Sequence, residues 1–306
     1  MHSRTIFIVI AALILPGFAQ AEESDIATKL KSCNQAIMEG DASKALAYAE
    51  QVLKQDKNNR DALLCEGRAY GGTARYKEAL EALQAAEKAS ATPLEHIVAL
   101  TLIGNVQKSA GQFPEALATY RQSLTIAQAE KEQRFERINL NQIGETQAAN
   151  HQSEGALESY LAGSKLAAND NERADSFARI AATYSDLGKH DQAIEYQIKA
   201  LLMEERGGDL DHYANAGLEM GRIYTAAKDY PNAEKAINKI VKLSKDQGGA
   251  YWEAKSYYYL ALNKVASGES EAAKPLLADA KQICEEIGAQ SLDDEISQAL
   301  SKLPQK

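Results

Sequence analysis

The sequence predicts an all-α protein built from stacked helical hairpins. Seven times along its 306 residues, a small residue is followed twelve positions later by an alanine. Between the two, seven positions after the small residue, stands a residue that is glycine in four of the seven copies. A fixed internal spacing repeated along a chain is typical of stacked hairpins. The pairs are Cys33/Ala45, Gly67/Ala79, Gly104/Ala116, Gly144/Ala156, Ala181/Ala193, Gly221/Ala233 and Ala261/Ala273.

The first 21 residues are predicted to be a secretory signal peptide rather than part of the fold. Arg4 precedes an apolar run over 6–15, and the small residues Ala19 and Ala21 flank Gln20 as a signal peptidase requires. The alternative is a membrane anchor, but a spanning helix needs about 20 apolar residues. We therefore expect cleavage after Ala21, a periplasmic or secreted protein, and no stable membrane insertion after cleavage.

Each hairpin is expected to turn on a residue in the left-handed conformation, which glycine adopts without steric cost. The seven turn positions are Gly40, Ala74, Gly111, His151, Gly188, Lys228 and Gly268. The small residue that precedes each turn lies inside a helix, where a glycine such as Gly104 costs about 0.5–1 kcal/mol relative to alanine. A chain tolerates this cost where two backbones must approach closely. We therefore expect the small residue of the first helix to face the alanine of the second, as Gly104 would face Ala116.

The three cysteines allow a disulfide bond but do not establish one from the sequence. Cys33 and Cys65 lie on neighbouring first helices, and export would permit a bridge. A bridge requires Cα atoms about 4.4–6.8 Å apart and both side chains in the shared interface. Because Cys65 stands two residues before Gly67, on a different side of its helix, we expect buried free thiols rather than a bridge. Cys284 is expected to be a small core residue.

Two repeats resemble the tetratricopeptide repeat (TPR) closely. They carry its pattern at Leu63, Gly67, Tyr70, Tyr76, Ala79 and Leu83, and at Leu100, Gly104, Gly111, Phe113, Ala116 and Tyr120. Successive small positions lie 34, 37, 40, 37, 40 and 40 residues apart, against the usual 34. The chain is therefore similar to the long-repeat branch, which includes kinesin light chain and bacterial peptide-responsive regulators. The resemblance implies a right-handed superhelical solenoid over 22–290, with its fifth repeat weakened by Gln197 at an expected apolar position.

A capping helix is predicted over 291–303, followed by a tail over 304–306. Ser291 and Asp294 have the spacing of a capping box. Leu292, Ile296 and Leu300 form one apolar stripe that would cover the last hairpin.

Signals for catalysis are poor. The sequence contains no glycine-rich phosphate loop, no paired histidines at metal-ligand spacing and no nucleophile motif, so we expect no enzyme activity, no metal and no cofactor. The net charge of −9 argues against nucleic acid as a partner. Lys235, Lys239, Lys242 and Lys245 form a basic row that would suit an acidic partner, but a solvated helix face is the favoured interpretation.

Partner binding is expected on the first helices. TPR proteins bind partners in the concave groove that these helices line, at the third residue before the small position and at the first and fourth after it. The groove residues that this resemblance implies are Thr101, Asn105, Lys108, Asn141, Glu145, Leu218, Arg222 and Tyr258, with Ala148, Ala178, Ala182, Ser185, Thr225, Leu262 and Val265 at equivalent positions.

The leading hypothesis is a non-catalytic periplasmic scaffold or assembly factor that holds a peptide or partner protein, of unknown identity, in this groove. A ligand-responsive regulatory or sensor subunit is the alternative. An enzyme with an unrecognised site is the third class.

Overall fold

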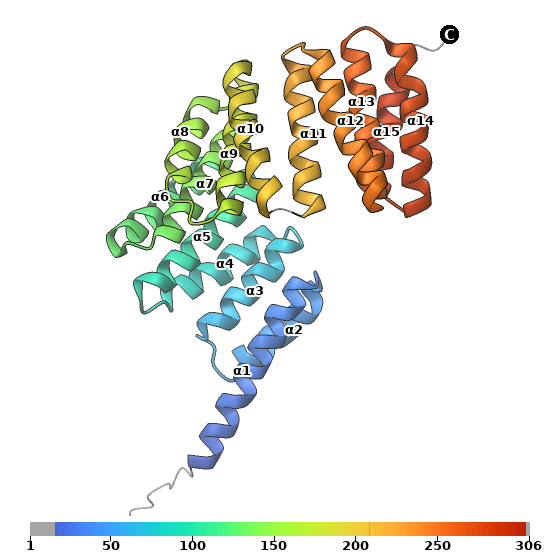
Figure 1. Ribbon diagram of the computed structural model, residues 1–306. Coiled ribbons are helices and arrows are strands. Elements are labelled where there is room, and N and C mark those ends of the chain that lie inside the picture. Colours follow the sequence, from blue (N-terminus) through green and yellow to red (C-terminus); the bar gives the residue numbers. More distant parts are fainter. Residues whose placement is uncertain (1–15, 208, 304–306) are drawn as a thin grey trace, which may run out of the picture. The chain divides into compact units, whose positions relative to one another are not determined.

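The computed structural model describes residues 16–207 and 209–303. Within these residues it contains fifteen helices and no strand (Figure 1). The chain divides into two compact units between Glu130 and Lys131, and each is described by itself. The all-α hairpin architecture that the repeats predict is confirmed in both.

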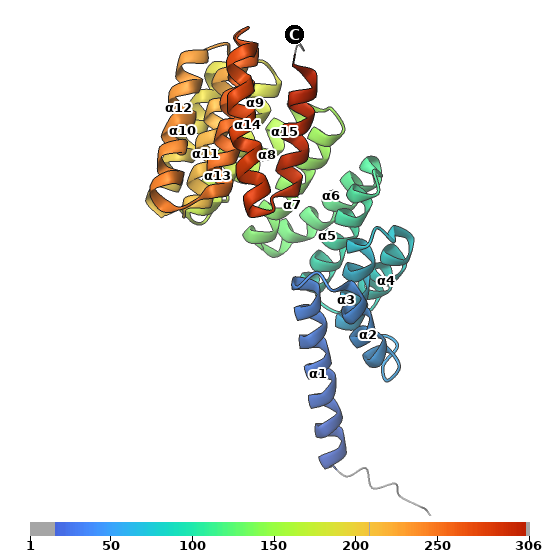
Figure 2. The ribbon, with the colours of Figure 1, turned by 90° about the vertical axis from the view of Figure 1, so that its right-hand side faces the viewer.

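The first unit consists of three hairpins. In each, a first helix packs on the second helix that follows it in sequence. Figure 2 shows α1 continuing well beyond the end of its shorter partner α2. The helices are α1 (Pro16–Met38), α2 (Ala42–Leu53), α3 (Arg60–Gly72), α4 (Tyr76–Lys88), α5 (Pro93–Ser109) and α6 (Phe113–Glu130).

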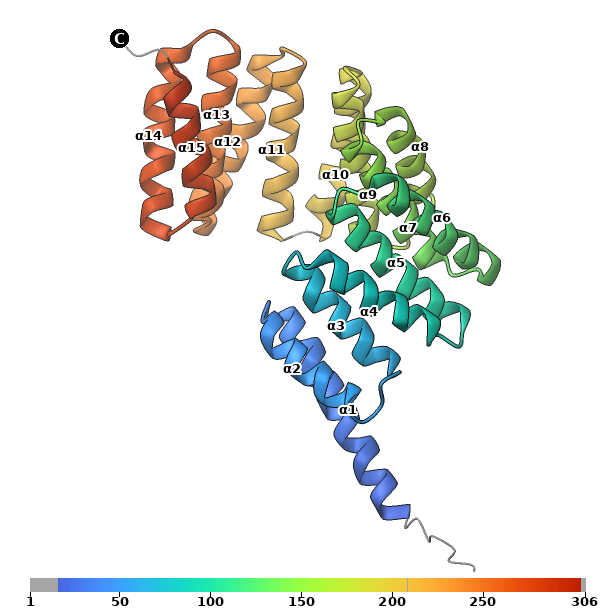
Figure 3. The same cartoon turned by 180° about the vertical axis from the view of Figure 1, so that it is seen from behind.

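The second unit consists of four hairpins and a final helix. Figures 1 and 3 show its last helices, α11 to α15, standing side by side. The helices are α7 (Gln133–Ala149), α8 (Ser153–Ser164), α9 (Asp170–Asp186), α10 (His190–Gly207), α11 (Leu210–Ala226), α12 (Tyr230–Gln247), α13 (Ala250–Ala266), α14 (Ser270–Ile287) and α15 (Gln290–Lys302).

The residue at each predicted turn position has a positive φ in all seven hairpins. The four glycines Gly40, Gly111, Gly188 and Gly268 have φ between 69° and 88°, and Ala74, His151 and Lys228 have φ of 58°, 57° and 61°. The predicted turn is therefore confirmed. Three hairpins make it with a residue whose Cβ is strained in this conformation.

Long repeats differ from short ones in their second helix. The second helices α6, α10, α12 and α14 have 18 residues, whereas α2, α4 and α8 have 12 or 13. After α6, α12 and α14 the chain makes a second left-handed turn, at Lys131, Gly248 and Gly288. The additional residues of the 40-residue repeats therefore lengthen the second helix, and after α6 and α12 they also add this turn.

The two helices of a hairpin approach each other closely at the small residue, as expected. The alanine of the second helix makes only part of this contact. A Cβ placed on Gly104 would lie 2.5 Å from the ring of Tyr120, four residues beyond Ala116. On Gly67 it would lie 2.5 Å from Leu83, and the Ala79 carbonyl oxygen would be 3.2 Å away. The residue one turn after the alanine therefore fills the space that the glycine leaves open, and the alanine lies beside it.

Cys33 and Cys65 form a disulfide, and the expectation of free thiols is wrong. Both residues are at most 1 % exposed, and their Cα atoms are 6.4 Å apart. The bridge forms because α1 contacts α3 directly as well as through α2, so Cys65 faces α1 although it lies on a different side of α3 from Gly67. Cys284 is buried, as expected, and burial raises the pKa of its thiol.

The final helix, α15, begins at Gln290, one residue before the start predicted from the sequence. Its N-cap is Ala289, and no side chain caps it, so the expected capping box of Ser291 and Asp294 is wrong. The left-handed Gly288 sets the start of the helix earlier and leaves Ser291 inside its first turn. Leu292 and Ile296 are buried in the core of the last hairpin, with Leu300 half-buried beside them.

The apolar run over 6–15 and the tail over 304–306 lie outside the described residues. In the part of the chain that the structure describes, no helix combines the length and apolar composition needed to span a bilayer.

Candidate partner-binding groove

In each unit the first helices form the inner layer. Successive first helices contact one another directly, α1 with α3 and α3 with α5 in the first unit, and α9 with α11 and α11 with α13 in the second. Among the described residues, no two second helices pack together to a comparable extent. Each unit is therefore more tightly curved on the side of its first helices, and we call this side the first-helix face.

Three of the predicted groove residues do not lie on this face. Thr101, Asn141 and Leu218, each at the third position before the small residue, are 8, 7 and 1 % exposed. The Thr101 hydroxyl donates to the Ile97 carbonyl at 2.7 Å and lies 3.1 Å from the Ser123 hydroxyl of α6. Residues three apart share a helix face, so in these three repeats the position points with the small residue toward the second helix, whereas Ala178 and Tyr258 at the equivalent position are half-buried.

Four predicted residues after the small position, Asn105, Lys108, Glu145 and Arg222, are half-buried, and several already contact other side chains. The Asn105 amide oxygen accepts a hydrogen bond from the Tyr120 hydroxyl at 2.7 Å, which leaves the amide NH2 as a donor. Arg222 pairs with Glu219 at 2.7 Å, and Glu145 pairs with Arg179 of the next repeat. Lys108 is half-buried near the end of α5. A partner that uses Arg222 or Glu145 must compete with these pairs.

A second set of residues on this face was missed from the sequence. They lie two positions before the small residue. Arg179 and Glu219 contact the first position after the small residue in the preceding and in the same repeat, and Tyr259 contacts Glu219. Arg179 donates to Glu145 and, at 3.0 Å, to Asp175, and Glu219 accepts from Arg222. The Tyr259 hydroxyl lies 3.5 Å from Glu219, and burial together with that carboxylate raises the pKa of Tyr259 to about 12. The sequence signal that could have identified these residues is the opposite charge at these two positions in neighbouring repeats.

The first unit has a cavity of 320 Å³ on this face, between α1, α3 and α5. Asn105, one of the predicted groove residues, lines it together with apolar side chains and Arg68. Arg68 donates to the Asn34 side chain at 2.9 Å. Its lining residues are Ile37, Arg68, Gly71, Gly72, Leu83, Leu102, Asn105, Val106 and Ser109.

The second unit has two cavities on this face. One, of 200 Å³, lies between α13 and α15 and contains Tyr258, Leu262 and Val265, all three of the groove positions implied for the last repeat. Leu262 and Val265 are 38 and 40 % exposed, which is high for apolar side chains. The other, of 370 Å³, lies between α9 and α11 and contains Ala178.

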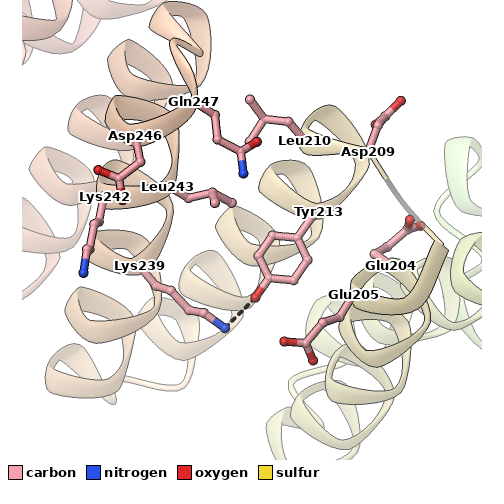
Figure 4. A pocket seen from close by; sticks show the side chains of 10 residues that line it. All are labelled: Glu204, Glu205, Asp209, Leu210, Tyr213, Lys239, Lys242, Leu243, Asp246 and Gln247. Atoms are coloured by element: carbon pink, nitrogen blue, oxygen red, sulfur yellow. Dashed lines mark hydrogen bonds between the residues drawn. The ribbon is translucent and has the colours of Figure 1, made fainter.

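A larger cavity of 710 Å³ lies away from the first-helix face, among α10, α11 and α12 (Figure 4). Lys239 and Lys242 of the basic row line it, opposite Glu204 and Glu205. The Lys239 ammonium donates to the Tyr213 hydroxyl at 2.5 Å. All four lysines of the basic row are exposed, as expected of a solvated face, and two of them border this hollow, which contains charges of both signs.

Comparison with known proteins supports the repeat assignment. Residues 99–134 and 174–206 each match the tetratricopeptide repeat family. Outer dynein arm-docking complex subunit 4 of Homo sapiens is 25 % identical over 199 residues, which are 64 % of this chain and 30 % of that protein. The Mus musculus protein gives 25 % over the same length. The chain thus spans about a third of the length of these relatives.

Solved structures share the fold at low sequence identity. The apo form of RapI is 14 % identical with a TM-score of 0.66, over 85 % of this chain and 77 % of that one. A putative kinesin light chain of Podosopora anserina with TPR-like repeats is 18 % identical with a TM-score of 0.57, over 63 % and 97 %. These similarities show a TPR-like helical repeat fold.

Proposed function

We propose that this chain is a non-catalytic interaction module that holds a peptide or partner protein on its first-helix face. The observation that carries the proposal is that each unit has at least one cavity on its first-helix face, and each of these cavities contains at least one residue that the TPR resemblance implies for the groove. Such cavities combine apolar side chains with a few polar groups, as preformed peptide sites do. In the cavity at α13 and α15, Leu262 and Val265 offer apolar surface beside Glu295 and Lys302.

Site-specific photo-crosslinking in living cells tests this proposal. A photoreactive phenylalanine at Leu262 is expected to capture a discrete partner. The same probe at Ile198, an apolar residue of comparable exposure on the second helix α10, serves as the matched control. Capture at Ile198 with none at Leu262 would place the partner on the opposite layer and contradict the proposal.

Export to the periplasm, after cleavage behind Ala21, is the second part of the proposal. The Cys33–Cys65 disulfide supports it, because disulfides persist in oxidising compartments. Cys33 and Ala36, the first buried side chains of α1 within 25–38, lie beyond the proposed cleavage position. Fractionation and the intact mass of the mature protein are the test. A mature chain that begins at Glu22 is expected, and a cytoplasmic protein that retains 1–21 would refute export.

A further inference from the structure

We propose that the cavity between α1, α3 and α5, here the α1/α3/α5 pocket, binds an aspartate or glutamate side chain of the partner together with a neighbouring apolar side chain. This inference rests on the proposed function and names the chemistry of one anchor on the first-helix face. The pocket has a volume of 320 Å³ and lies wholly within the first unit. Ligand pockets typically have volumes of about 300–1,000 Å³, so this pocket suits a few side chains of an extended segment rather than a folded domain.

The pocket joins equivalent positions of three successive repeats. Ile37 and Gly71 stand at the fourth position after the small residue in the first and second repeats. Arg68 and Asn105 stand at the first position after it in the second and third repeats. These are positions that the TPR resemblance implies for the groove, and here three first helices bring them around one hollow.

Arg68 carries a positive charge that no carboxylate beside it offsets. It is half-buried and forms none of the ion pairs found among the described residues, whereas Arg60 and Arg75 each pair with a carboxylate. The nearest acidic residue in the sequence, Glu66, is influenced by Glu50 of α2, whose charge adds to burial in raising the pKa of Glu66. No acidic side chain lines the pocket, although the protein has a net charge of −9. The charge of the pocket is therefore complementary to an anion.

Hydrogen bonds hold the Arg68 guanidinium in place before a partner binds. It donates to the Asn34 Oδ1 at 2.9 Å, and the Asn34 Nδ2 in turn donates to the Leu30 carbonyl at 3.1 Å. A guanidinium has five N–H donors, and no other described residue accepts from this one. A planar donor group fixed in this way matches the two oxygens of a carboxylate, and it loses little conformational freedom on binding.

The other polar groups of the pocket are also donors. The Asn105 Oδ1 accepts from the Tyr120 hydroxyl at 2.7 Å, so the amide NH2 is the group that a ligand can use. The Ser109 hydroxyl lines the pocket beside it. Arg68 is the one cation of the lining, and its single charge matches a carboxylate better than a phosphate group, whose charge is about −1.5 to −2.

Gly71 leaves open the space for an apolar side chain. Its φ is not positive, so the backbone does not require glycine there, and glycine within a helix lowers stability relative to alanine. A Cβ on Gly71 would lie 3.3 Å from the Val106 Cγ2, a contact that a small shift relieves. The open space is bordered by Leu83, Leu102 and Val106, which suit an apolar side chain next to the carboxylate. The equivalent residues in the other repeats all have a side chain: Ile37, Lys108, Ala148, Ser185, Thr225 and Val265.

Two short peptides test the inference on the full chain. Acetyl-Leu-Glu-Leu-amide is titrated against the ¹⁵N-labelled protein, alongside acetyl-Leu-Gln-Leu-amide, which has the same shape without the charge. We expect saturable shifts of the Arg68 Nε–H and the Asn105 side-chain amide with the glutamate peptide, and at least about tenfold weaker binding of the glutamine peptide, because hydrogen bonds to charged groups are the stronger kind. Equal binding of the two peptides, or tighter binding of acetyl-Leu-Gln-Leu with a free C-terminal carboxylate, would overturn the inference.

Variants separate the pocket from the net charge of the protein. Arg68→Gln is expected to weaken binding of the glutamate peptide about tenfold or more. The matched control Arg121→Gln removes the same charge from an exposed position on α6 outside the pocket, and it should leave affinity within about twofold, since exposed charges contribute little. Equal losses in the two arginine variants would overturn the inference.

A third variant tests the open space. Gly71→Leu fills the pocket and should abolish the binding of both peptides, while its urea midpoint shows whether it folds. Unchanged affinity in the folded variant would contradict the pocket, and the two arginine variants keep the test decisive if Gly71→Leu does not fold.

The two proposals fail independently, because the pocket lies in the first unit and Leu262 in the second. If the glutamate peptide does not bind but crosslinking at Leu262 captures a partner, the anchor is wrong and the proposed function survives. If the peptide binds specifically but the partner is captured at Ile198 and not at Leu262, the pocket stands and the proposed function is wrong.

Discussion

Two glycines in the first unit should respond oppositely to the same substitution. A Cβ placed on Gly72 or on Gly111 would meet no atom within 4 Å, so neither change creates a clash. Gly72 ends the helix α3 and has no positive φ, whereas Gly111 has a φ of 73° at its hairpin turn. A comparison of the two substitutions therefore isolates the effect of the backbone conformation at the replaced glycine.

The expected magnitudes follow from that difference. An L-residue in the left-handed conformation costs about 1–2 kcal/mol, and removal of glycine from the unfolded chain returns about 0.4–1 kcal/mol. Gly111→Ala should therefore destabilise the protein by about 0.5–1 kcal/mol. Gly72→Ala should stabilise it by about 0.5 kcal/mol, because alanine is the better helix former.

Urea unfolding of the full chain measures both effects. At a slope of roughly 2 kcal/mol per molar urea, the two midpoints should separate by about 0.5–0.7 M, with the wild type between them. Hydrogen exchange of amides in α3 to α6 reports the same difference within the first unit. Midpoints that shift in the same direction for both variants would refute the conformational argument.

Four further outcomes are expected. Lys228→Gly removes left-handed strain and should raise stability by about 0.5–1 kcal/mol; a lower melting temperature would contradict this. Gly104→Ala places a methyl group against the Tyr120 ring and should cost about 1–3 kcal/mol, so an unchanged urea midpoint would count against the close approach. Cys33→Ser opens a bridge between residues 32 apart and should cost about 3–4 kcal/mol in non-reducing buffer, whereas a wild-type mass that shows three free thiols would exclude the bridge. Burial, with the Glu50 charge, raises the pKa of Glu66 above 4.5, so its ionised form destabilises the folded state once the pH exceeds that value; Glu66→Gln should therefore stabilise the protein at pH 7 but not at pH 4, and equal effects at both would disprove the assignment.

The hairpins could be predicted because their determinants are local. A left-handed residue, a small residue and an alanine occur at constant separations, and each acts within one hairpin. Ala74, His151 and Lys228 adopt positive φ although none is glycine, since the phase of the two flanking helices fixes the turn. The start of α15 was missed for a similarly local reason, because the left-handed Gly288 outweighs the side-chain signal of Ser291.

The candidate site was harder to predict because it depends on the rotation of each helix. Successive residues of a helix are rotated by about 100° around its axis. An error of one residue in the register therefore moves a position from the core to the groove or from the groove to the core. Thr101, Asn141 and Leu218 were placed in the groove and are buried. Arg179 and Glu219, on neighbouring positions, are on the first-helix face and carry its charge pairs. The disulfide was missed in the same way, because it depends on direct contact between α1 and α3.

Departures from a repeat pattern are where function is expected, but a cost to stability does not by itself identify a site. His151 and Lys228 depart from glycine at exposed turns, and no described cavity adjoins them. Gln197 departs from an apolar residue inside the helix layers, and it is 1 % exposed. Its amide NH2 donates to the Ala216 carbonyl of the next first helix at 2.8 Å, so the cost of burying a polar group is offset by a hydrogen bond. A polar residue at an apolar repeat position is therefore accommodated by the fold, and it does not identify a binding site by itself.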